Sequence, residues 1–356
     1  MLIPRMALLA ELDEITYEWV RSHFDIVLER EPGNVTQIMD PDFLAASLPA
    51  SRVEVAVAEA HPFPRSVLRT ASPYLRLIAS VRTNPANVDT KAAQEYGILV
   101  SRSPGRNVDA VAEFTIAQIL NCARHIPFAF RALYRGEYLL PENSEHLSNS
   151  NDVIWYHPEL ISGRPYFAFR GRQISGSVLG IVGYGVIGRR VAALAKNLGM
   201  KIVYYDPYPH FECPDPDIGD RVEILEDLLA QADFISLHAR LSPETEGMIN
   251  SRTLARMKPT AFLVNTSRGS LIRQSELVIA LKNRTIAGAA LDVFEDEPLR
   301  CDNEILELDN CLCTPHLSGA TREVISNHSI SVRRNLEAYL SGVPLPDQYC
   351  ESEAKK

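Results

Sequence analysis

The chain has 356 residues, of which 46% are hydrophobic and 23% are charged, and it carries a formal net charge of −9 at pH 7. These are ordinary values for a globular protein, and the length suits two domains better than one. Because the negative charge is spread along the chain without a basic cluster, nucleic acid and anionic membranes are not expected as general partners.

The N-terminus and the cysteines both predict a cytoplasmic protein. The first ten residues are largely apolar, but Glu11, Asp13 and Glu14 follow at once and no small-residue cleavage site is present. Neither a signal peptide nor a membrane span is therefore predicted. No two cysteines form a C-x-x-C pair and no histidine has a spacing suited to zinc, which favours reduced thiols and no metal site. The six cysteines are Cys122, Cys213, Cys301, Cys311, Cys313 and Cys350.

In chain order, the first hundred residues alternate between short apolar runs and stretches with helical periodicity. The runs predict strands at residues 6–10, 25–28, 53–58, 76–80 and 98–101, and the clearest stretches between them predict helices at 13–22 and 88–96. Alternation of this kind predicts a parallel sheet of its own, covered by helices.

A long helix and an irregular stretch follow. After a turn at residues 103–105, Asp109 is predicted to cap a helix over 110–126, which would link two domains. Residues 136–177 then lose all periodicity and contain isolated aromatic residues. A connection of this length usually has a function or makes a contact. A contact with a partner subunit, a rim of the substrate site and a plain surface excursion remain alternatives.

The chain is organised around residues 178–206, which predict a β-α-β unit. An apolar strand leads directly into Gly183, Gly185 and Gly188 in the spacing G-x-G-x-x-G, and helical periodicity and a second strand follow. In such a unit the first glycine permits a sharp turn and the second lets the backbone approach a pyrophosphate. The third allows the helix to pack closely on the strand. The phosphates are then bound at the helix N-terminus, where free N–H groups favour negative charge.

Asp206 ends the second strand of this unit, where a carboxylate can accept hydrogen bonds from the adenosine ribose hydroxyls. The next four residues, Pro207, Tyr208, Pro209 and His210, include no Lys or Arg to hold a 2′-phosphate. NAD is therefore predicted in preference to NADP. Glycine-rich turns also occur as plain loops between packed elements, but here the flanking strand, helix and acid all favour a dinucleotide site.

After residue 206 the alternation of strands and helices resumes. Strands are predicted at residues 232–241, 261–266, 287–293 and 311–314, with helices at 252–257 and 276–282. This order continues a doubly wound parallel sheet. A final helix over residues 321–340 is predicted to fold back on the N-terminal sheet.

Three polar side chains, Arg268, Glu297 and His316, follow three of these strands. Singly, they read as a solvated loop charge, a turn residue before proline and a satisfied buried histidine. In open α/β sheets, however, ligands bind beyond the carboxyl ends of the strands. Together the three supply what hydride transfer between a nicotinamide and a 2-hydroxy acid requires. Histidine is a base near neutral pH, a carboxylate orients it, and a guanidinium pairs with the substrate carboxylate and polarises the carbonyl.

Around these residues the chain resembles the D-isomer-specific 2-hydroxyacid dehydrogenase family, which includes phosphoglycerate, glycerate and D-lactate dehydrogenases. The resemblance covers roughly residues 76–342 and is carried by GYGVIGRRVA with Asp206, NTSRGS, ALDVFEDEP and TPHLSGAT. It implies that His316 is the acid/base, that Glu297 is its carboxylate partner and that Arg268 binds substrate.

The resemblance also implies the architecture and the coenzyme contacts. A Rossmann NAD domain over residues 109–317 is expected to be inserted into a flavodoxin-like α/β substrate domain made of residues 1–108 and 318–356. A homodimer through the NAD domain is expected, with residues 136–177 as part of the contact. Besides the three glycines, the implied coenzyme contacts are Val186, Ile187, Asp206, Thr266, Ser267, Arg268, Asp292 toward the nicotinamide amide, His316, Ser318 and Gly319.

One loop departs from the family pattern. Many members have glycines where this chain reads RTNPANVD at residues 82–89, and the loop offers backbone N–H groups to the substrate carboxylate. Arg82, Thr83 and Asn84 are therefore predicted to bind substrate. Polar side chains of Thr83 and Asn84 in the pocket would favour a polyhydroxylated substrate, unless both point away and only the backbone matters. Arg106, nearby, would meet a phosphate or a second carboxylate, or be a surface charge.

The sequence thus predicts an NAD-dependent oxidoreductase that interconverts a small D-2-hydroxy acid and its 2-oxo acid, without a metal. A corepressor of the C-terminal-binding-protein type is the alternative, because those scaffolds keep this fold and NAD site, and the three side chains fit both classes. Formate dehydrogenases share the fold but carry glutamine in the carboxylate position, so Glu297 argues against that activity.

Overall fold

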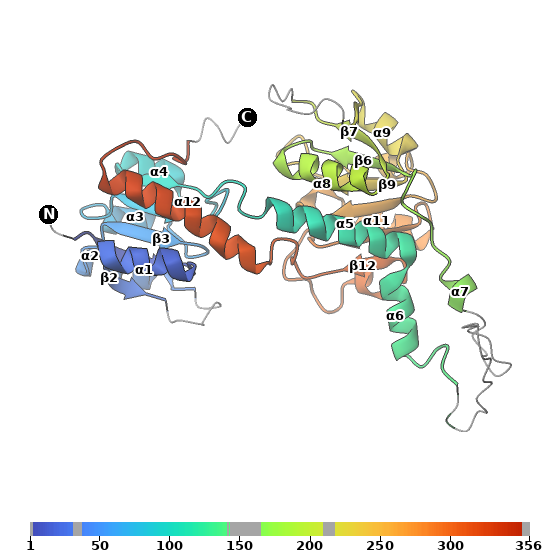
Figure 1. The fold of residues 1–356 in the computed structure, drawn as a ribbon, viewed down its shortest axis with the longest axis horizontal. Coiled ribbons are helices and arrows are strands. Elements are labelled where there is room, and N and C mark those ends of the chain that lie inside the picture. Colours follow the sequence, from blue (N-terminus) through green and yellow to red (C-terminus); the bar gives the residue numbers. More distant parts are fainter. Residues whose placement is uncertain (1–2, 31–37, 141, 143–164, 209–217, 351–356) are drawn as a thin grey trace. The chain divides into compact units, whose positions relative to one another are not determined.

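The computed structural model describes residues 3–30, 38–140, 142, 165–208 and 218–350. The chain divides into two compact units, Met1–Asn107 with Ala320–Lys356, and Val108–Gly319. Each unit is a parallel sheet covered by helices (Figure 1), which confirms the predicted α/β class. In the part of the chain that is described, no helix is both long enough and apolar enough to cross a lipid bilayer.

The first unit contains a five-stranded parallel sheet in the order β2-β1-β3-β4-β5. This is the flavodoxin-like order that was predicted for the substrate domain. Its strands are β1 (Arg5–Leu9), β2 (Asp25–Glu29), β3 (Val55–Ala58), β4 (Leu77–Ser80) and β5 (Leu99–Ser101). Its helices are α1 (Glu14–His23), α2 (Pro41–Ala50), α3 (Arg65–Ala71), α4 (Thr90–Glu95) and α12 (Arg322–Leu340).

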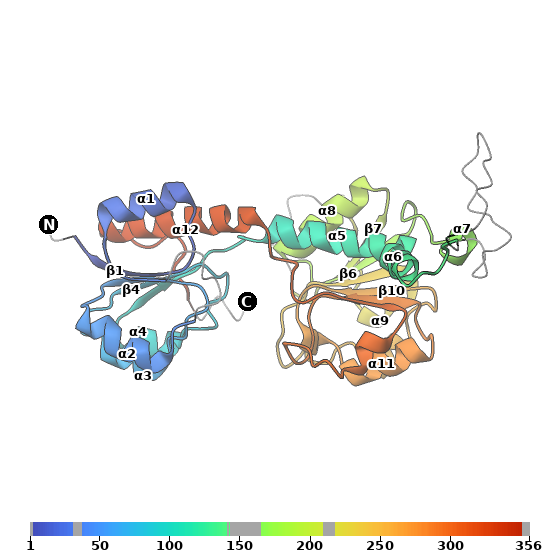
Figure 2. The same ribbon diagram turned by 90° about the horizontal axis from the view of Figure 1, so that it is seen from below.

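Both faces of this sheet are buried. Successive side chains of a strand point to opposite faces. On β1, Met6 packs with Val20 of α1 and Val332 of α12, whereas Ala7 packs with Leu44 of α2 on the other face. Figure 2 shows α1 and α12 on one side of the sheet and α2, α3 and α4 on the other. The last helix therefore folds back on the N-terminal sheet, as predicted.

The second unit contains a seven-stranded parallel sheet in the order β12-β11-β10-β9-β6-β7-β8. The order reverses between β6 and β9, so this is the switch point of a doubly wound sheet. Its strands are β6 (Val178–Val182), β7 (Lys201–Tyr205), β8 (Asp220–Arg221), β9 (Phe234–Leu237), β10 (Phe262–Asn265), β11 (Gly288–Leu291) and β12 (Cys311–Cys313). Its α-helices are α5 (Val108–Arg124), α6 (Ile126–Tyr134), α7 (Pro165–Ala168), α8 (Val186–Asn197), α9 (Leu225–Gln231), α10 (Ser251–Leu254) and α11 (Gln274–Lys282).

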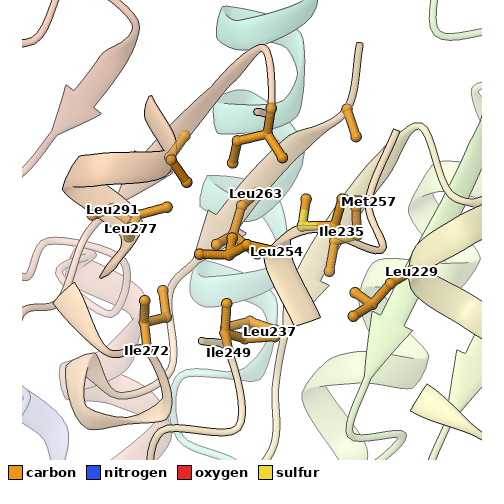
Figure 3. Close-up of a cluster of buried hydrophobic side chains, with 14 of the residues drawn as sticks. Leu229, Ile235, Leu237, Ile249, Leu254, Met257, Leu263, Ile272, Leu277 and Leu291 are labelled. Atoms are coloured by element: carbon orange, nitrogen blue, oxygen red, sulfur yellow. The ribbon is translucent and has the colours of Figure 1, made fainter. Parts of the chain in front are cut away.

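Helices α5 and α8 pack on one face of this sheet, and α9, α10 and α11 pack on the other. Figure 3 shows the apolar cluster on the second face, in which Leu229 of α9, Leu254 of α10 and Leu277 of α11 surround Ile235 and Leu263 of the central strands. This rigid core holds the carboxyl ends of the strands in fixed positions, because buried side chains of this kind are close-packed.

The prediction that Asp109 caps the linking helix is wrong. Helix α5 begins one residue earlier, at Val108, and the Asp109 carboxylate accepts a hydrogen bond of 2.6 Å from Arg190 Nε on α8. The helix ends at Arg124 because His125 has a left-handed backbone (φ 54°), and α6 follows directly. Of the irregular stretch at residues 136–177, residues 141 and 143–164 lie outside the described part of the chain.

Candidate active site

The residues after β11 and β12 bring Glu297 and His316 into direct contact. His316 Nδ1 lies 2.7 Å from Glu297 Oε2, and the other carboxylate oxygen of Glu297 accepts the N–H of Phe294 at 3.0 Å. A deprotonated carboxylate accepts only, so Nδ1 carries the hydrogen in this pair. Among the described residues Nε2 has no hydrogen-bond partner, and half of the His316 side chain is exposed (51%). The nitrogen that can exchange a proton therefore points away from Glu297.

A buried carboxylate holds the histidine loop. Asp292, with no exposed surface, accepts hydrogen bonds from Thr314 Oγ1 (2.7 Å), Leu317 N (2.8 Å) and Ser318 N (2.7 Å). The backbone N–H of His316 donates to the Asp292 carbonyl at 2.9 Å, and His316 has φ 56°. The Asp292 carboxylate, predicted to contact the nicotinamide amide, thus lies inside the histidine loop and fixes the histidine backbone. This role was missed from the sequence.

The turn that carries Arg268 is held from within. The buried Asn265 side chain donates to the Arg268 carbonyl (2.8 Å) and accepts from Ser267 N (3.0 Å). Ser267 Oγ donates to the Ala239 carbonyl at 2.8 Å. The Arg268 side chain is exposed, and its Nη1 donates to the Ser267 carbonyl at 2.6 Å. Asn265, which the sequence analysis did not single out, therefore presents the guanidinium at the surface.

Close packing joins the Arg268 turn to the loop of Glu297. A Cβ on Gly269 would collide with the Phe294 carbonyl, so the two backbones touch there. Phe294 N in turn donates to Glu297. The turn after β10, the loop after β11 and the loop after β12 are therefore contiguous at one edge of the sheet. No contact joins the Arg268 side chain to Glu297 or His316 in the described residues.

The glycine loop after β6 has the geometry that its spacing predicts. Gly183 has φ 92°, and a Cβ there would clash with the backbone of His238 and Ala239. A Cβ on Gly188 would collide with the Gly183 carbonyl, which confirms the close packing of α8 on the strand. By contrast, a Cβ on Gly185 would meet no atom within 4 Å, so the backbone is open at that position.

Asp206 ties β7 to this loop. Its Oδ2 accepts the N–H of Tyr184 at 2.7 Å and its Oδ1 accepts the N–H of Tyr208 at 3.0 Å, with 8% of the residue exposed. These bonds fix the carboxylate at the end of β7. Of the other predicted coenzyme contacts, Val186 is exposed, Ile187 and Gly319 are partly buried, and Thr266 and Ser318 are buried.

A histidine that the sequence analysis did not single out lies beside the glycine loop. Burial lowers the pKa of His238 to about 4, and its Nε2 lies 2.8 Å from Ser236 Oγ. His238 follows β9, and its backbone lies against Gly183. The imidazole is therefore neutral at physiological pH.

In the first unit, the predicted substrate loop is fixed by Ser103. Ser103 N donates to the Arg82 carbonyl (2.9 Å), Ser103 Oγ donates to the Ser80 carbonyl (3.1 Å), and Thr83 Oγ1 donates to the Ser103 carbonyl (3.1 Å). The Thr83 hydroxyl is thus engaged within the unit. Asn84 is exposed, and its side chain makes no hydrogen bond within the described residues.

Arg106 is neither a free surface charge nor an open anion site. Its Nη1 lies 3.1 Å from Glu59 Oε1 and 3.3 Å from His328 Nδ1, and only 17% of its side chain is exposed. His328 Nε2 bonds the Glu11 carbonyl at 2.7 Å. Burial is the main reason that the pKa of His328 lies below its usual value. Arg106 therefore forms an internal ion pair, which is neither of the two roles expected for it, anion binding or a surface charge.

Comparison with known proteins identifies relatives of this chain. The family model for the NAD binding domain of D-isomer specific 2-hydroxyacid dehydrogenases matches residues 116–318. A glyoxylate reductase of Korarchaeum cryptofilum is 34% identical over 359 residues, covering 99% of this chain and 97% of that protein. A hydroxypyruvate reductase of Blautia hydrogenotrophica is 34% identical over 284 residues, covering 80% of this chain and 81% of that protein.

Among solved structures, the TT0316 protein of Thermus thermophilus is similar, with a TM-score of 0.78 and 29% identity over 97% of this chain and all of that one. The described residues hold no group of three or more His, Cys, Asp or Glu side chains that could bind a metal ion. The matched domain implies a nicotinamide coenzyme and chemistry on 2-hydroxy or 2-oxo acids. The chain therefore belongs to the D-isomer-specific 2-hydroxyacid dehydrogenase family of oxidoreductases.

Proposed function

We propose that this enzyme interconverts a small D-2-hydroxy acid and its 2-oxo acid with NAD, using His316 as the acid/base, Glu297 to orient it and Arg268 to bind the substrate carboxylate. The observation that carries the proposal is the 2.7 Å contact between His316 Nδ1 and Glu297 Oε2. That contact leaves Nε2 as the ring atom available to exchange a proton with substrate.

The proton route follows from the tautomer. In the reducing direction, protonated His316 donates its Nε2 hydrogen to the substrate oxygen, and Glu297 stabilises the imidazolium beforehand. In the oxidising direction, neutral Nε2 takes the hydroxyl proton. The nicotinamide, when bound, supplies or accepts the hydride. Because Asp292 and Thr314 fix the histidine loop, the imidazole needs little rearrangement before proton transfer.

Arg268 suits the carboxylate of the substrate. Its guanidinium is exposed, and a planar fork pairs bidentately with a carboxylate. In the first unit, the backbone N–H groups of Thr83 and Asn84 have no acceptor among the described residues, so they offer two more donors. We assign substrate binding to Arg268 and to the Arg82, Thr83 and Asn84 loop.

The coenzyme site is assigned to the carboxyl ends of β6 and β7. Open backbone at Gly185 and the N-terminus of α8, with Val186 and Ile187, would bind the diphosphate. The fixed Asp206 carboxylate would accept hydrogen bonds from the ribose hydroxyls and would repel a 2′-phosphate, which favours NAD over NADP. Pro209 and His210, which entered that prediction, lie outside the described residues. Thr266, Ser267, Ser318 and Gly319 would complete the contacts, whereas the Asp292 side chain is buried within the histidine loop.

We further propose that residues 109–317 form the coenzyme domain and that residues 1–108 and 318–356 form the substrate domain. A homodimer through the coenzyme domain has a candidate surface on α6, whose exposed side chains include Ile126, Phe130, Leu133 and Tyr134. These recur at i, i+4, i+7 and i+8, so they form one apolar stripe. We also propose a cytoplasmic location, where thiols stay reduced.

The relatives named above suggest which acids to test. We expect NADH oxidation with glyoxylate or hydroxypyruvate, and less with NADPH at equal concentration. The measurement is the initial rate against a panel that also contains pyruvate and sugar-derived 2-oxo acids. Tight NADH binding without turnover on any of these acids would contradict the proposal and favour a scaffold role. A higher kcat/KM with NADPH would overturn the coenzyme assignment.

A further inference from the structure

Two cysteines on β12 lie in contact. Cys311 Sγ and Cys313 Sγ are 3.8 Å apart, and their side chains share one face because they are two residues apart on a strand. Two other described cysteines, Cys122 and Cys301, have no such thiol contact among the described residues. None of the chemistry assigned so far uses the Cys311 and Cys313 pair.

The strand geometry brings the two sulfur atoms close, but the strand must bend for them to bond. A rise of about 3.3 Å per residue places the two Cα atoms, and the two roughly parallel Cβ atoms, about 6.6 Å apart. The Cα separation lies at the upper end of the range of about 4.4–6.8 Å found for disulfides, and the Cβ separation exceeds the usual range of about 3.5–4.5 Å. Among the described residues, β12 is an edge strand that pairs with β11 alone, with Cys311 opposite Ala289 and Cys313 opposite Leu291. It can therefore adjust without disturbing a second neighbour.

The two thiols are unequal, which gives them different chemical roles. The hydrogen bond from Cys311 is the main reason that the pKa of Cys313 lies below its usual value, and the charge of Arg131 on α6 lowers it further. The same hydrogen bond, with burial, raises the pKa of Cys311 well above its usual value. Cys313 is also partly exposed, whereas Cys311 is only 4% exposed. Cys313 is thus the accessible nucleophile, and Cys311 lies ready to resolve it.

We propose that Cys311 and Cys313 form an oxidisable dithiol that a hydroperoxide converts to a disulfide. The Cys313 thiolate attacks one peroxide oxygen and the O–O bond breaks. The departing oxygen takes up a proton from the solvent, so an alcohol or water leaves as Cys313 becomes a sulfenic acid. Cys311 then loses its proton and its sulfur attacks the sulfenic sulfur, so the S–O bond breaks and water leaves. The two thiols lose two electrons in total, and the hydroperoxide gains them.

The bridge would act on the histidine loop. Thr314 follows Cys313 directly, and its hydroxyl donates to Asp292 at 2.7 Å. The His316 N–H lies 3.0 Å from the Thr314 carbonyl. Drawing the sulfur atoms from 3.8 Å to about 2.05 Å shifts the end of β12 and hence His316. Because misplacement of a catalytic group by about 1 Å costs about a hundredfold, oxidation should lower turnover by about ten- to a hundredfold. This consequence, unlike the bridge itself, rests on the proposed role of His316.

The experiment treats the full chain with dilute hydrogen peroxide, counts free thiols and maps crosslinked peptides by mass spectrometry. We expect loss of two thiols, one intrachain Cys311–Cys313 bridge, and full reversal by dithiothreitol. Cys311→Ser and Cys313→Ser should each abolish the bridge, whereas Cys301→Ser, which removes an exposed lone thiol, should leave it intact. Faster oxidation of Cys301 or Cys350, or conversion of Cys313 to a sulfinic acid while Cys311 stays reduced, would overturn the site.

Turnover measured in parallel separates this inference from the proposed function. A bridge that forms and lowers turnover reversibly supports both the site and its coupling to His316. A bridge that forms without a change in turnover refutes the coupling. An enzyme that is inactive even when fully reduced refutes the proposed function, and the thiol count and peptide map still decide whether the dithiol is oxidised.

Discussion

The carboxyl ends of the strands in the second unit differ from the loop after β4 in the first. The exposed ionisable groups after β10, β11 and β12 are Arg268, Glu297 and His316. The buried Asn265 and Asp292 form hydrogen bonds that hold the turns carrying Arg268 and His316. The loop after β4 is held by hydrogen bonds to Ser103 and presents backbone N–H groups and one exposed amide, Asn84.

This difference separates two tasks. Proton transfer needs charged groups at fixed distances, which a buried hydrogen-bond network provides. Recognition of the rest of the substrate needs donors whose side chains can vary without disturbing the core. The second unit is therefore expected to determine the rate, and the first unit to determine the choice of substrate. Substitutions of the site residues test this division in order of decreasing expected effect on activity, and His238→Asn tests acid stability.

His316→Gln should lower kcat by about 10²–10⁴, because glutamine can form hydrogen bonds but cannot exchange a proton as an acid/base. NADH affinity, measured by fluorescence titration, should not change. His23→Gln, which alters an exposed histidine on α1, is the matched control and should keep full activity. Unchanged kcat in His316→Gln would remove this residue from the mechanism.

Arg268→Lys should lower kcat/KM for a 2-oxo acid by about ten- to a hundredfold, since a hydrogen bond to a charged group is worth about 1.5–3 kcal/mol. Lysine keeps the charge but loses the planar fork. Arg252→Lys, at an arginine whose side chain is 80% exposed, is the control and should be silent. Equal kcat/KM in wild type and Arg268→Lys would show that the fork is not used.

Thr314→Val should leave the Asp292 carboxylate with one donor fewer while keeping the shape of the side chain. We expect a loss of about 1.5–3 kcal/mol in the free energy of unfolding, as for the loss of a hydrogen bond to a charged group. The measurement is a urea titration. The control is Thr70→Val, which removes a hydroxyl that bonds only its own helix, and the free energy of unfolding should change far less in this variant. A lower kcat with unchanged KM would show that the network positions the histidine. Stability equal to wild type would contradict the network.

Asn84→Ala should change selectivity rather than rate. If the exposed amide contacts a substrate hydroxyl, the ratio of kcat/KM for hydroxypyruvate to that for pyruvate should fall about two- to tenfold, as for a hydrogen bond of about 0.5–1.5 kcal/mol. Activity on glyoxylate should stay the same. Thr83→Val should affect all substrates alike, because it loosens the loop instead of removing a contact. An unchanged ratio in Asn84→Ala would show that only the backbone of the loop matters.

The last prediction concerns acid stability rather than activity. His238 resists protonation in the folded state, with a pKa of about 4, whereas an unfolded histidine takes up a proton near pH 6.5. Its stabilising contribution is therefore present above about pH 6.5 and is lost as the pH falls toward 4. His238→Asn should flatten the melting temperature against pH in this window, and His23→Asn should not. Parallel curves for wild type and His238→Asn would refute the assignment.

Much of the fold follows from local patterns in the sequence. The strands other than β8, and the helix after Gly188, were predictable because apolar runs and glycines alternate along the chain. Strand β8 was missed because its two residues, Asp220 and Arg221, are both charged. Helices α2 and α3 were missed, since α2 contains Pro49 and α3 has only seven residues, too few for clear periodicity.

Contacts between residues distant in the sequence limit how much of the site can be predicted. Strand ends direct attention to Arg268, Glu297 and His316, because ligands bind at those ends. The inward role of Asp292 and the bond from Thr83 to Ser103 depend on contacts between residues 20 or more positions apart. Residue type alone does not specify such partners.

The proposed function requires this enzyme to reduce a 2-oxo acid to the D enantiomer of the 2-hydroxy acid with NADH. The most direct test is to incubate it with hydroxypyruvate and NADH and to resolve the enantiomers of the glyceric acid that forms. We expect the D enantiomer, formed in equal amount to the NADH consumed. The L enantiomer, or NADH oxidation without glyceric acid, would contradict it.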